Sequence, residues 1–224
     1  MERFHFPEHR RSYFVSHLLL RTTLSRYSEL LPKSWRFIYN DHGKPRLDPG
    51  LGAIPLFFSL SHTKGISVVG VTRGREIGVD VEQAERSMRA AELSRRFFSP
   101  EENAVLETLP PGRLQEQFTL YWTLKEAFIK ALGRGLSHPL DSFSFRLTGE
   151  RPHRIDFSTD QIQAPDAWRF ALIAPRPGSV VALCVASDGD QDIELSCALA
   201  LPSGETAPLE GAPLGLSAGV VYSR

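Results

Sequence analysis

The chain has 224 residues, enough for one large domain or two small ones, and 42% of them are hydrophobic, which supports a sizeable buried core. Its 26 basic and 26 acidic side chains cancel, so no global field favours nonspecific binding to nucleic acid or to a membrane surface. Neither the number nor the spacing of Cys184 and Cys197 suggests a disulfide framework or a thiolate metal site, and no apolar stretch approaches the length of a membrane span. These features favour a cytoplasmic protein, and we also expect it to be a monomer.

The first part of the chain predicts a basic amphipathic helix followed by a loop and strands. Apolar residues recur at helical spacing from Ser12 to Arg26, next to Arg10 and Arg11. Pro45 disfavours a helical conformation for Lys44, so Gly43-Lys44-Pro45 is predicted to be a loop. Three apolar, β-branched runs then predict a three-stranded meander: Leu56–Ser61, Ile66–Val71 and Ile77–Glu82.

The second part predicts helices and then strands again. Ser99-Pro100 marks a helix start, and a strong helix is expected from Leu114 to Leu132, ended by Gly133. Strands are expected at Ser142–Leu147, Trp168–Ile173 and Val180–Ala186. The fold class is therefore α+β, with two similar halves at 1–78 and 79–200 and the active site between them. Residues 201–224 are rich in Gly, Pro, Ala and Ser and are expected to form a loosely ordered tail.

Asp80 and Glu82 are the first candidates for chemistry. They stand two residues apart on a predicted strand, so both carboxylates point to one face and can share a hard cation. An acidic, half-exposed strand without function is the simpler interpretation of this spacing, and by itself the motif is weak.

The long helix supplies a third carboxylate. Glu126 and Lys130 share a face at i and i+4, with Lys125 on the next ridge. A solvated Glu–Lys pair is the alternative, but Trp122 and Phe128 lie so near that a partly buried carboxylate in need of a partner is expected. Three carboxylates suit Mg²⁺, which commonly binds few protein oxygens together with substrate phosphates.

A further set of cationic and hydroxyl groups could hold a phosphate. Ser61, His62 and Lys64 lie at the turn after the first strand of the meander, and Lys44 lies in the preceding loop. A lone histidine is more often structural than functional. The functional interpretation therefore depends on the order in which these motifs occur.

That order resembles the Sfp-type 4′-phosphopantetheinyl transferases. The resemblance spans most of the chain and rests on these motifs: Gly43-Lys44-Pro45, Ser61-His62, Ile77-Gly-Val-Asp80-Val-Glu82, Phe97-Phe98-Ser99, Trp122-Thr-Leu-Lys125-Glu126-Ala-Phe-Ile-Lys130, Gly133–Ser137 and Pro139–Phe143. Two departures stand out. Ser59 occupies a position where the family often has Asn, and the chain begins at the family's first long helix, so the opening strand is expected to be missing.

The resemblance implies transfer of the 4′-phosphopantetheine arm of coenzyme A to a serine of a carrier protein, with release of adenosine 3′,5′-bisphosphate. The implied roles are as follows: Asp80, Glu82 and Glu126 bind Mg²⁺; Lys130 neutralises the pyrophosphate; Lys44, Ser61 and His62 hold the 3′-phosphate; Lys125, Arg10 and Arg11 assist in binding coenzyme A. The base that takes the serine proton stays open among Glu126, a metal-bound water or hydroxide, and Glu102.

The partner and two other functions also remain open. A mixed basic and apolar stretch is a candidate docking site for an acidic carrier protein, or simply a solvated helix face: Arg86, Met88, Arg89, Leu93, Arg95 and Arg96. A family member that binds coenzyme A or carrier without turnover is one alternative. A metal-dependent nuclease is another, which the neutral net charge disfavours.

Overall fold

The computed structural model describes residues 7–83, 89–151, 153–159, 165–189, 192–201, 203, 205–209 and 211–223. Its helices are α1 (Pro7–Leu24), α2 (Ala90–Phe97), α3 (Pro100–Glu107) and α4 (Pro111–Leu132). Its strands are β1 (Phe37–Tyr39), β2 (Pro45–Leu47), β3 (Leu56–Thr63), β4 (Ile66–Arg73), β5 (Ile77–Gln83), β6 (Phe143–Thr148), β7 (His153–Thr159), β8 (Trp168–Ala174), β9 (Ser179–Ala186), β10 (Ile193–Ser196), β11 (Ala198–Ala200), β12 (Thr206–Pro208), β13 (Ala212–Leu216) and β14 (Val220–Ser223). Mixed helix and sheet agree with the predicted α+β class.

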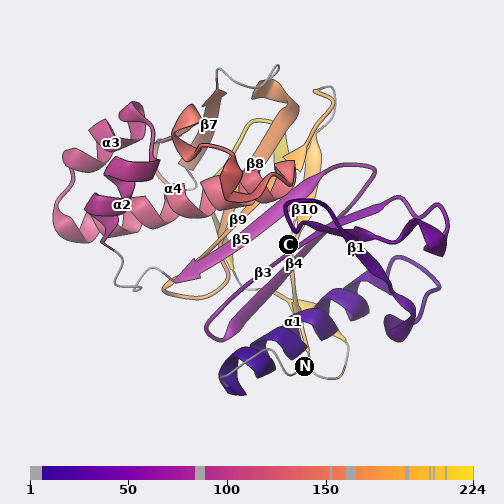
Figure 1. Cartoon of the computed structure of the whole chain (residues 1–224). Helices are drawn as coiled ribbons and strands as arrows, with labels where there is room; N and C mark the ends of the chain where they lie inside the picture. Colours follow the sequence, from indigo (N-terminus) through magenta and orange to yellow (C-terminus); the bar gives the residue numbers. More distant parts are fainter. Residues whose placement is uncertain are drawn as a thin grey trace.

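A small unit is formed by α1 and the antiparallel β3–β4 hairpin (Figure 1). Apolar side chains from the helix, the following loop and the hairpin form its core: Leu20, Leu24, Trp35, Leu56 and Phe58. The short antiparallel hairpin of β1 and β2 lies between them in the sequence. Because the hairpin is packed on α1, the end of β3 that carries His62 is held in place. The prediction of a turn at Ser61 and His62 is wrong, because β3 continues to Thr63.

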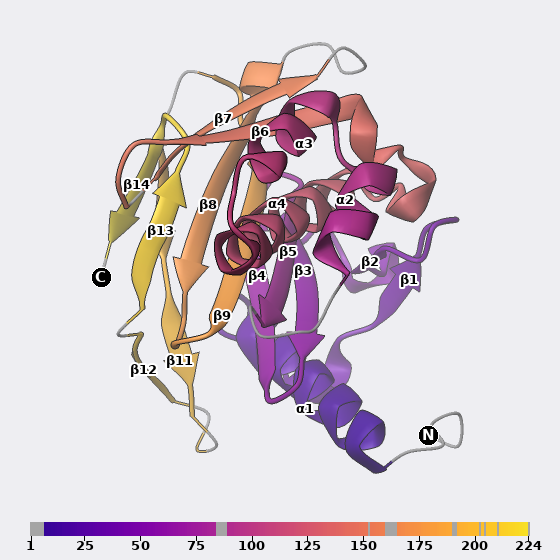
Figure 2. The same ribbon diagram turned by 90° about the vertical axis from the view of Figure 1, so that its left-hand side faces the viewer.

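The larger unit is a six-stranded sheet in the order β5-β9-β8-β13-β7-β6 (Figure 2). Helix α4 packs along this sheet, and its buried Phe128 contacts the rings of Phe143, Phe157, Trp168 and Phe170. Helices α2 and α3 pack beside α4. The aromatic core fixes α4 against the sheet, and this sets where its polar residues lie.

The predicted meander is wrong in its third strand. β3 pairs with β4, but β5 leaves the hairpin and pairs with β9, with Asp80 opposite Ala182. Gly70 of β4 allows β5 to pass close to the hairpin, because a Cβ at this position would lie 2.7 Å from Val79 Cγ1. β5 is therefore buried on both faces, between the hairpin and α4, rather than half exposed.

Gly78 sets the closest approach between β5 and α4. A Cβ at this position would overlap the carbonyl oxygen of Ala127 and the amide nitrogen of Ala131. Gly78, Asp80 and Glu82 alternate along the strand on one side, so the carboxylates share the side that contacts α4.

Replacing Gly78 by alanine should therefore destabilise the protein by about 1–3 kcal/mol or more, because helix and strand must separate. Urea unfolding measures the change. Gly112→Ala is the matched control: nothing lies within 4 Å of a Cβ there, and the residue is in the first turn of α4. Equal stability of Gly78→Ala and wild type would contradict the close approach.

The predicted helix ends are confirmed. Ser99 begins α3 with a capping box, in which its hydroxyl accepts from the Glu102 amide and the Glu102 carboxylate accepts from the Ser99 amide. Gly133 ends α4 in the left-handed conformation, with φ of 69°.

The expectation of a loosely ordered tail is wrong for the described residues after 200. β13 lies between β8 and β7, antiparallel to the first and parallel to the second. Leu214 packs on the aromatic core, whereas Leu216, Val220 and Tyr222 pack on Ala171 and Ile173. These apolar side chains are few and widely spaced in the sequence, but together they cover sheet surface that would otherwise be exposed.

The predicted boundary after residue 78 falls inside β5, which belongs entirely to the larger sheet. The division into two similar halves stays a prediction. Within the described part of the chain, no helix is both long and apolar enough to cross a bilayer.

Candidate functional site

Asp80 is buried at the contact between the two units, with 5% of its surface exposed. Its Oδ1 atom accepts a hydrogen bond from Ser61 Oγ at 2.9 Å and an ion-paired one from Lys130 Nζ at 2.6 Å. Lys130 Nζ also donates to Ser61 Oγ at 3.0 Å. Residues from β3, β5 and α4 thus meet at one carboxylate oxygen.

The second oxygen of Asp80 has a different environment. Among the described residues, Oδ2 is buried and has no hydrogen-bond partner. A buried carboxylate oxygen without a donor is costly, and a bound cation would satisfy it. The residues present therefore fit a hard cation on the Oδ2 side of Asp80.

Glu126 lies near the same charges. Burial, the main cause, together with the neighbouring carboxylates of Asp80 and Glu82, raises the pKa of Glu126 to about 7 against the opposing attraction of Lys130. A divalent cation would relieve this repulsion. Nevertheless, among the described residues no three His, Cys, Asp or Glu side chains lie close enough together to hold a metal ion. The three carboxylates of Asp80, Glu82 and Glu126 are therefore not preassembled as a metal site in this structure.

The stability of the metal-free protein should depend on the protonation of Glu126. Because its folded-state pKa of about 7 exceeds the ordinary value of 4.5, the stability from this group is complete below pH 4.5 and is lost as the pH rises through about 7. At roughly 1.4 kcal/mol per pH unit, the loss is at most about 3 kcal/mol. Urea unfolding in EDTA measures it, and Glu126→Gln should flatten this part of the profile. An unchanged slope in that variant would assign the dependence to another group.

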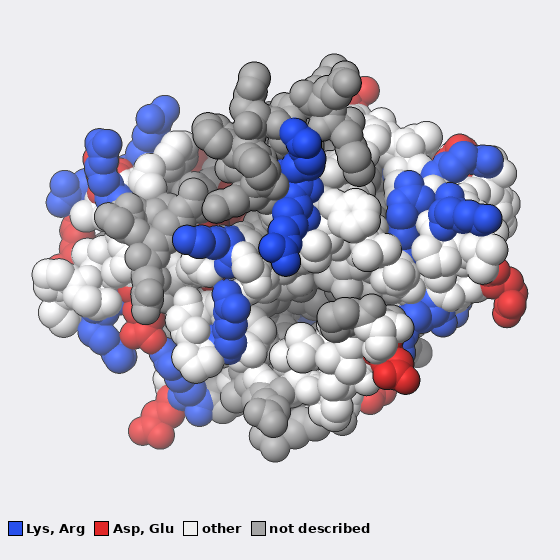
Figure 3. Space-filling model, turned by 90° about the horizontal axis from the view of Figure 1, so that it is seen from below, with Lys and Arg blue, Asp and Glu red and all other residues white. Residues whose placement is uncertain are grey.

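Five predicted residues line one cavity of about 270 Å³: Ser61, His62, Asp80, Glu82 and Lys130. Leu60, Thr63 and Val81 complete its wall. The predicted carboxylate strand and the residues predicted to bind phosphate are therefore brought together, although Ser61 and Asp80 are 19 positions apart in the sequence. Glu126 is not among the residues that line this cavity. Arg10 and Arg11 are exposed on α1. Figure 3 shows the side of the molecule seen from below, where Lys and Arg lie near the middle and also toward both edges, whereas Asp and Glu lie mostly toward the edges.

Lys125 is not at this cavity, which contradicts its assignment to coenzyme A binding. It is fully buried, and Nζ contacts Glu102 Oε2 at 2.8 Å and the carbonyl oxygens of Leu140 and Phe143 at 2.6 and 2.7 Å. Burial lowers the pKa of Lys125 and raises that of Glu102, while their mutual attraction opposes both shifts. Lys125 ties α4 to α3 and to the segment that precedes and begins β6.

Glu102 is also unsuited to act as the base. It is 1% exposed, and its two oxygens accept from the amides of Phe145 and Ser99 as well as from Lys125. Its position on the helix at N3 of the capping box explains this burial. Glu126 and water remain as candidates.

Lys44 also lies away from the residues that line the cavity. Its Nζ donates to Glu76 Oε2 at 2.6 Å and to the carbonyl oxygen of Ala131 at 2.7 Å, near the C-terminal end of α4. Asn40 Nδ2 donates to the Gly133 carbonyl beside it. Glu76, which sequence reasoning missed, precedes β5 directly. In this structure Lys44 stabilises the contact between the loop and α4, and its role in binding the 3′-phosphate stays a prediction.

The fold and the site together define a class of α+β protein. In this class, a cavity lined by a lysine and carboxylates lies between a helix-covered sheet and a smaller hairpin unit. The sequence profile of the 4′-phosphopantetheinyl transferase superfamily matches residues 76–184. The chain is 34% identical to 4′-phosphopantetheinyl transferase HetI of Nostoc, over 84% of this chain and 76% of that protein. It is 32% identical to 4′-phosphopantetheinyl transferase Sfp of Bacillus subtilis, over 86% of this chain and 82% of that protein. The chain belongs to the 4′-phosphopantetheinyl transferase superfamily.

Among solved structures, holo-[acyl-carrier-protein] synthase of Thermotoga maritima is similar over 50% of this chain and 62% of that chain, with 24% identity and a TM-score of 0.42. This likeness covers half of the chain, and the family assignment rests on the sequence relatives alone.

Proposed function

We propose that this chain moves the 4′-phosphopantetheine arm of coenzyme A onto a serine of a carrier protein, with Mg²⁺ as cofactor, and releases adenosine 3′,5′-bisphosphate. Family membership supports the reaction. The single observation that carries the site is the placement of Asp80: one oxygen is held by Lys130 and Ser61, and the other is buried without a partner among the described residues.

The residues that line the cavity, and Glu126 near them on α4, have separate roles in this proposal. Asp80, Glu82 and Glu126 would hold Mg²⁺, which when bound supplies positive charge to phosphate oxygens. Lys130 Nζ already lies at the rim, with its side chain 32% exposed, and can donate to a pyrophosphate oxygen as charge develops there. The His62 side chain, near the end of β3, lines the same cavity and can donate to a phosphate. Glu126, with its raised pKa, can accept the serine proton near neutral pH.

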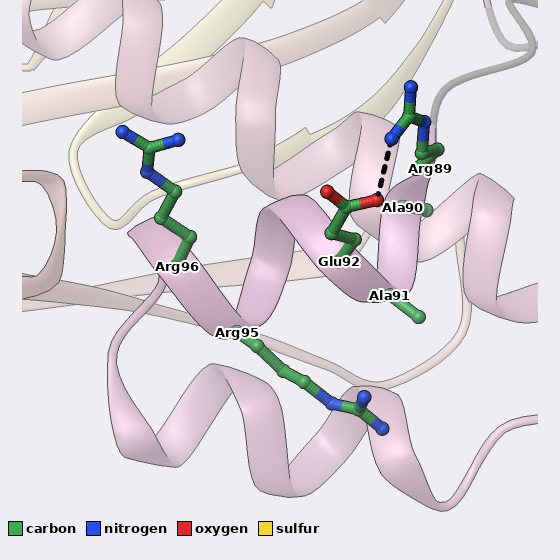
Figure 4. Close-up of a pocket in the computed structure, with 6 residues that line it drawn as sticks. All are labelled: Arg89, Ala90, Ala91, Glu92, Arg95 and Arg96. Atoms are coloured by element: carbon green, nitrogen blue, oxygen red, sulfur yellow. Dashed lines mark hydrogen bonds and ion pairs between the residues drawn. The ribbon is translucent and has the colours of Figure 1, made fainter.

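The carrier protein is proposed to dock at α2, whose exposed cationic side chains line an open hollow of about 600 Å³. Arg95 and Arg96 point to opposite sides of the helix, and Arg89 pairs with Glu92 at 3.2 Å (Figure 4). Arg86 and Met88, also predicted to take part, lie outside the described residues. A positive surface would attract an acidic carrier and orient it.

Intact-mass spectrometry of apo carrier proteins incubated with this chain, coenzyme A and Mg²⁺ tests the reaction. We expect the mass of each carrier to increase by one phosphopantetheine arm, and we expect EDTA to abolish this increase. Binding of coenzyme A without any gain on a panel of fatty-acid, polyketide and nonribosomal-peptide carriers would instead favour a binding protein.

Removing the two arginines of α2 should weaken carrier recognition selectively. Arg95→Ala combined with Arg96→Ala should raise KM for the carrier by about 10-fold and leave KM for coenzyme A unchanged. The reason is that charges at the rim of an interface act mainly on the rate at which the two proteins associate. Arg36→Ala, at an exposed arginine of the smaller unit, is the control. The effect should shrink at high salt. If the control variant and the double variant behave alike, docking at α2 is wrong.

The proposal includes a monomer in the cytoplasm. Both described thiols, Cys184 and Cys197, are free, which suits a reducing compartment.

A further inference from the structure

β3 and β5 lie side by side but belong to different sheets. β3 pairs with β4, and β5 pairs with β9 and forms the edge of the larger sheet. An edge strand presents every second amide and carbonyl group away from its partner strand, and buried groups of this kind need other hydrogen-bond partners.

Ser59 provides such a partner. Its side chain, 6% exposed, accepts a hydrogen bond from the Val79 amide at 3.0 Å. Gly70 lies opposite Ser59 in the hairpin, and its missing Cβ leaves room for the Val79 side chain. The contact is therefore a side-chain-to-backbone link between two sheets, made at the residue directly before Asp80.

A second serine on the same face of β3 completes the link. Ser61 stands two residues after Ser59 and donates to Asp80 Oδ1 at 2.9 Å. The two hydrogen bonds together fix the register of β5 relative to β3. A shift of β5 by one residue would turn the Asp80 side chain to the other side of the strand. Lys130 then meets the same carboxylate oxygen as Ser61.

We infer that Ser59 is a positioning residue for the cation site. By holding the Val79 amide, it keeps Asp80 in the orientation in which Oδ1 is taken by Ser61 and Lys130, while Oδ2 is left for a cation. The inference rests on the proposed function in that the cation site is the one used for transfer. Ser59 itself touches neither the cation nor the phosphates.

The test is the affinity for Mn²⁺ alone, a paramagnetic substitute for Mg²⁺, measured from the free-ion signal in electron paramagnetic resonance. Ser59→Ala should bind Mn²⁺ about 10-fold more weakly, as is usual when a residue that orients a ligand is lost. Ser59→Cys keeps the packing but is a weak acceptor and should behave like Ser59→Ala. Ser59→Thr keeps the hydroxyl and should retain most of the affinity.

Ser187→Ala is the matched control. Ser187 is also 6% exposed and also accepts a backbone amide, that of Gly189 at 3.2 Å, but it follows β9 outside the cavity. This variant should lose stability in urea as Ser59→Ala does and keep its Mn²⁺ affinity. The comparison separates positioning from general destabilisation.

Unchanged affinity in Ser59→Ala, or an equal loss in Ser187→Ala, would overturn the inference. If Ser59→Ala does not fold, Ser59→Cys decides by the same criterion. A wild-type protein that binds Mn²⁺ but modifies no carrier would contradict the proposed function and leave the role of Ser59 standing. A wild-type protein that binds no Mn²⁺, with or without coenzyme A, would overturn the inference.

Discussion

Replacing Asp80 by asparagine should lower kcat/KM for carrier modification at least about 100-fold. Asparagine keeps the shape and can still accept from Ser61, but it removes the negative charge that Lys130 and a cation share. The fold should survive, because the Lys130 side chain is 32% exposed and water can solvate its ammonium group. Initial rates of carrier modification, measured over a range of Mg²⁺ concentrations, give the effect.

The same variant has a second readout that does not depend on activity. Asp80 raises the pKa of Glu126, so its neutralisation should lower that pKa and shift the pH dependence of stability downward. Asp156→Asn is the control, because Asp156 pairs with Arg154 at 2.8 Å on β7 and should leave both readouts unchanged. Near-normal rates in Asp80→Asn would remove Asp80 from the metal site.

Replacing Lys125 by methionine should destabilise the protein by about 3–5 kcal/mol, because it leaves the Glu102 carboxylate charged, buried and without its cation. Urea unfolding measures the loss. Combining Lys125→Met with Glu102→Gln should recover a large part of it, since neither group is then charged. Arg154→Met is the control: its ion pair with Asp156 is exposed and should contribute no more than about 1 kcal/mol.

This experiment also decides what Lys125 does. If the protein folds, KM for coenzyme A should be unchanged in Lys125→Met, because the side chain is fully buried. A raised KM with unchanged stability would return Lys125 to the co-substrate site.

The sequence predicted the residues of the cavity better than their individual contacts. The spacing of Asp80 and Glu82 places both on one face of any strand, and the i,i+4 spacing of Glu126 and Lys130 does the same on a helix. Lys125 shows the limit of this reasoning. A helix position gives the direction of a side chain, but the burial of Lys125 depends on Glu102 and on the start of β6, which only the tertiary structure brings near.

The same limit applies to the strands. The runs that became β3, β4 and β5 were recognised from their apolar, β-branched residues, but the partner of β5 could not be, because pairing with β9 joins residues about a hundred positions apart. β7 and β13 were missed because their apolar residues are interrupted by Arg154, Asp156 and Gly215. Local pattern identifies a strand, whereas long-range packing selects its neighbours.

The place of β13 has a consequence for how the chain folds as it is synthesised. β6 and β7 form one hairpin and β8 and β9 another, but β13, the strand that joins them side by side, follows both hairpins in the sequence. Until the ribosome releases residues 212–216, β7 and β8 each present an unpaired edge in the sheet under α4. The nascent chain therefore has a late, long-range closing step, and a protein stalled before it exposes two edges open to aggregation.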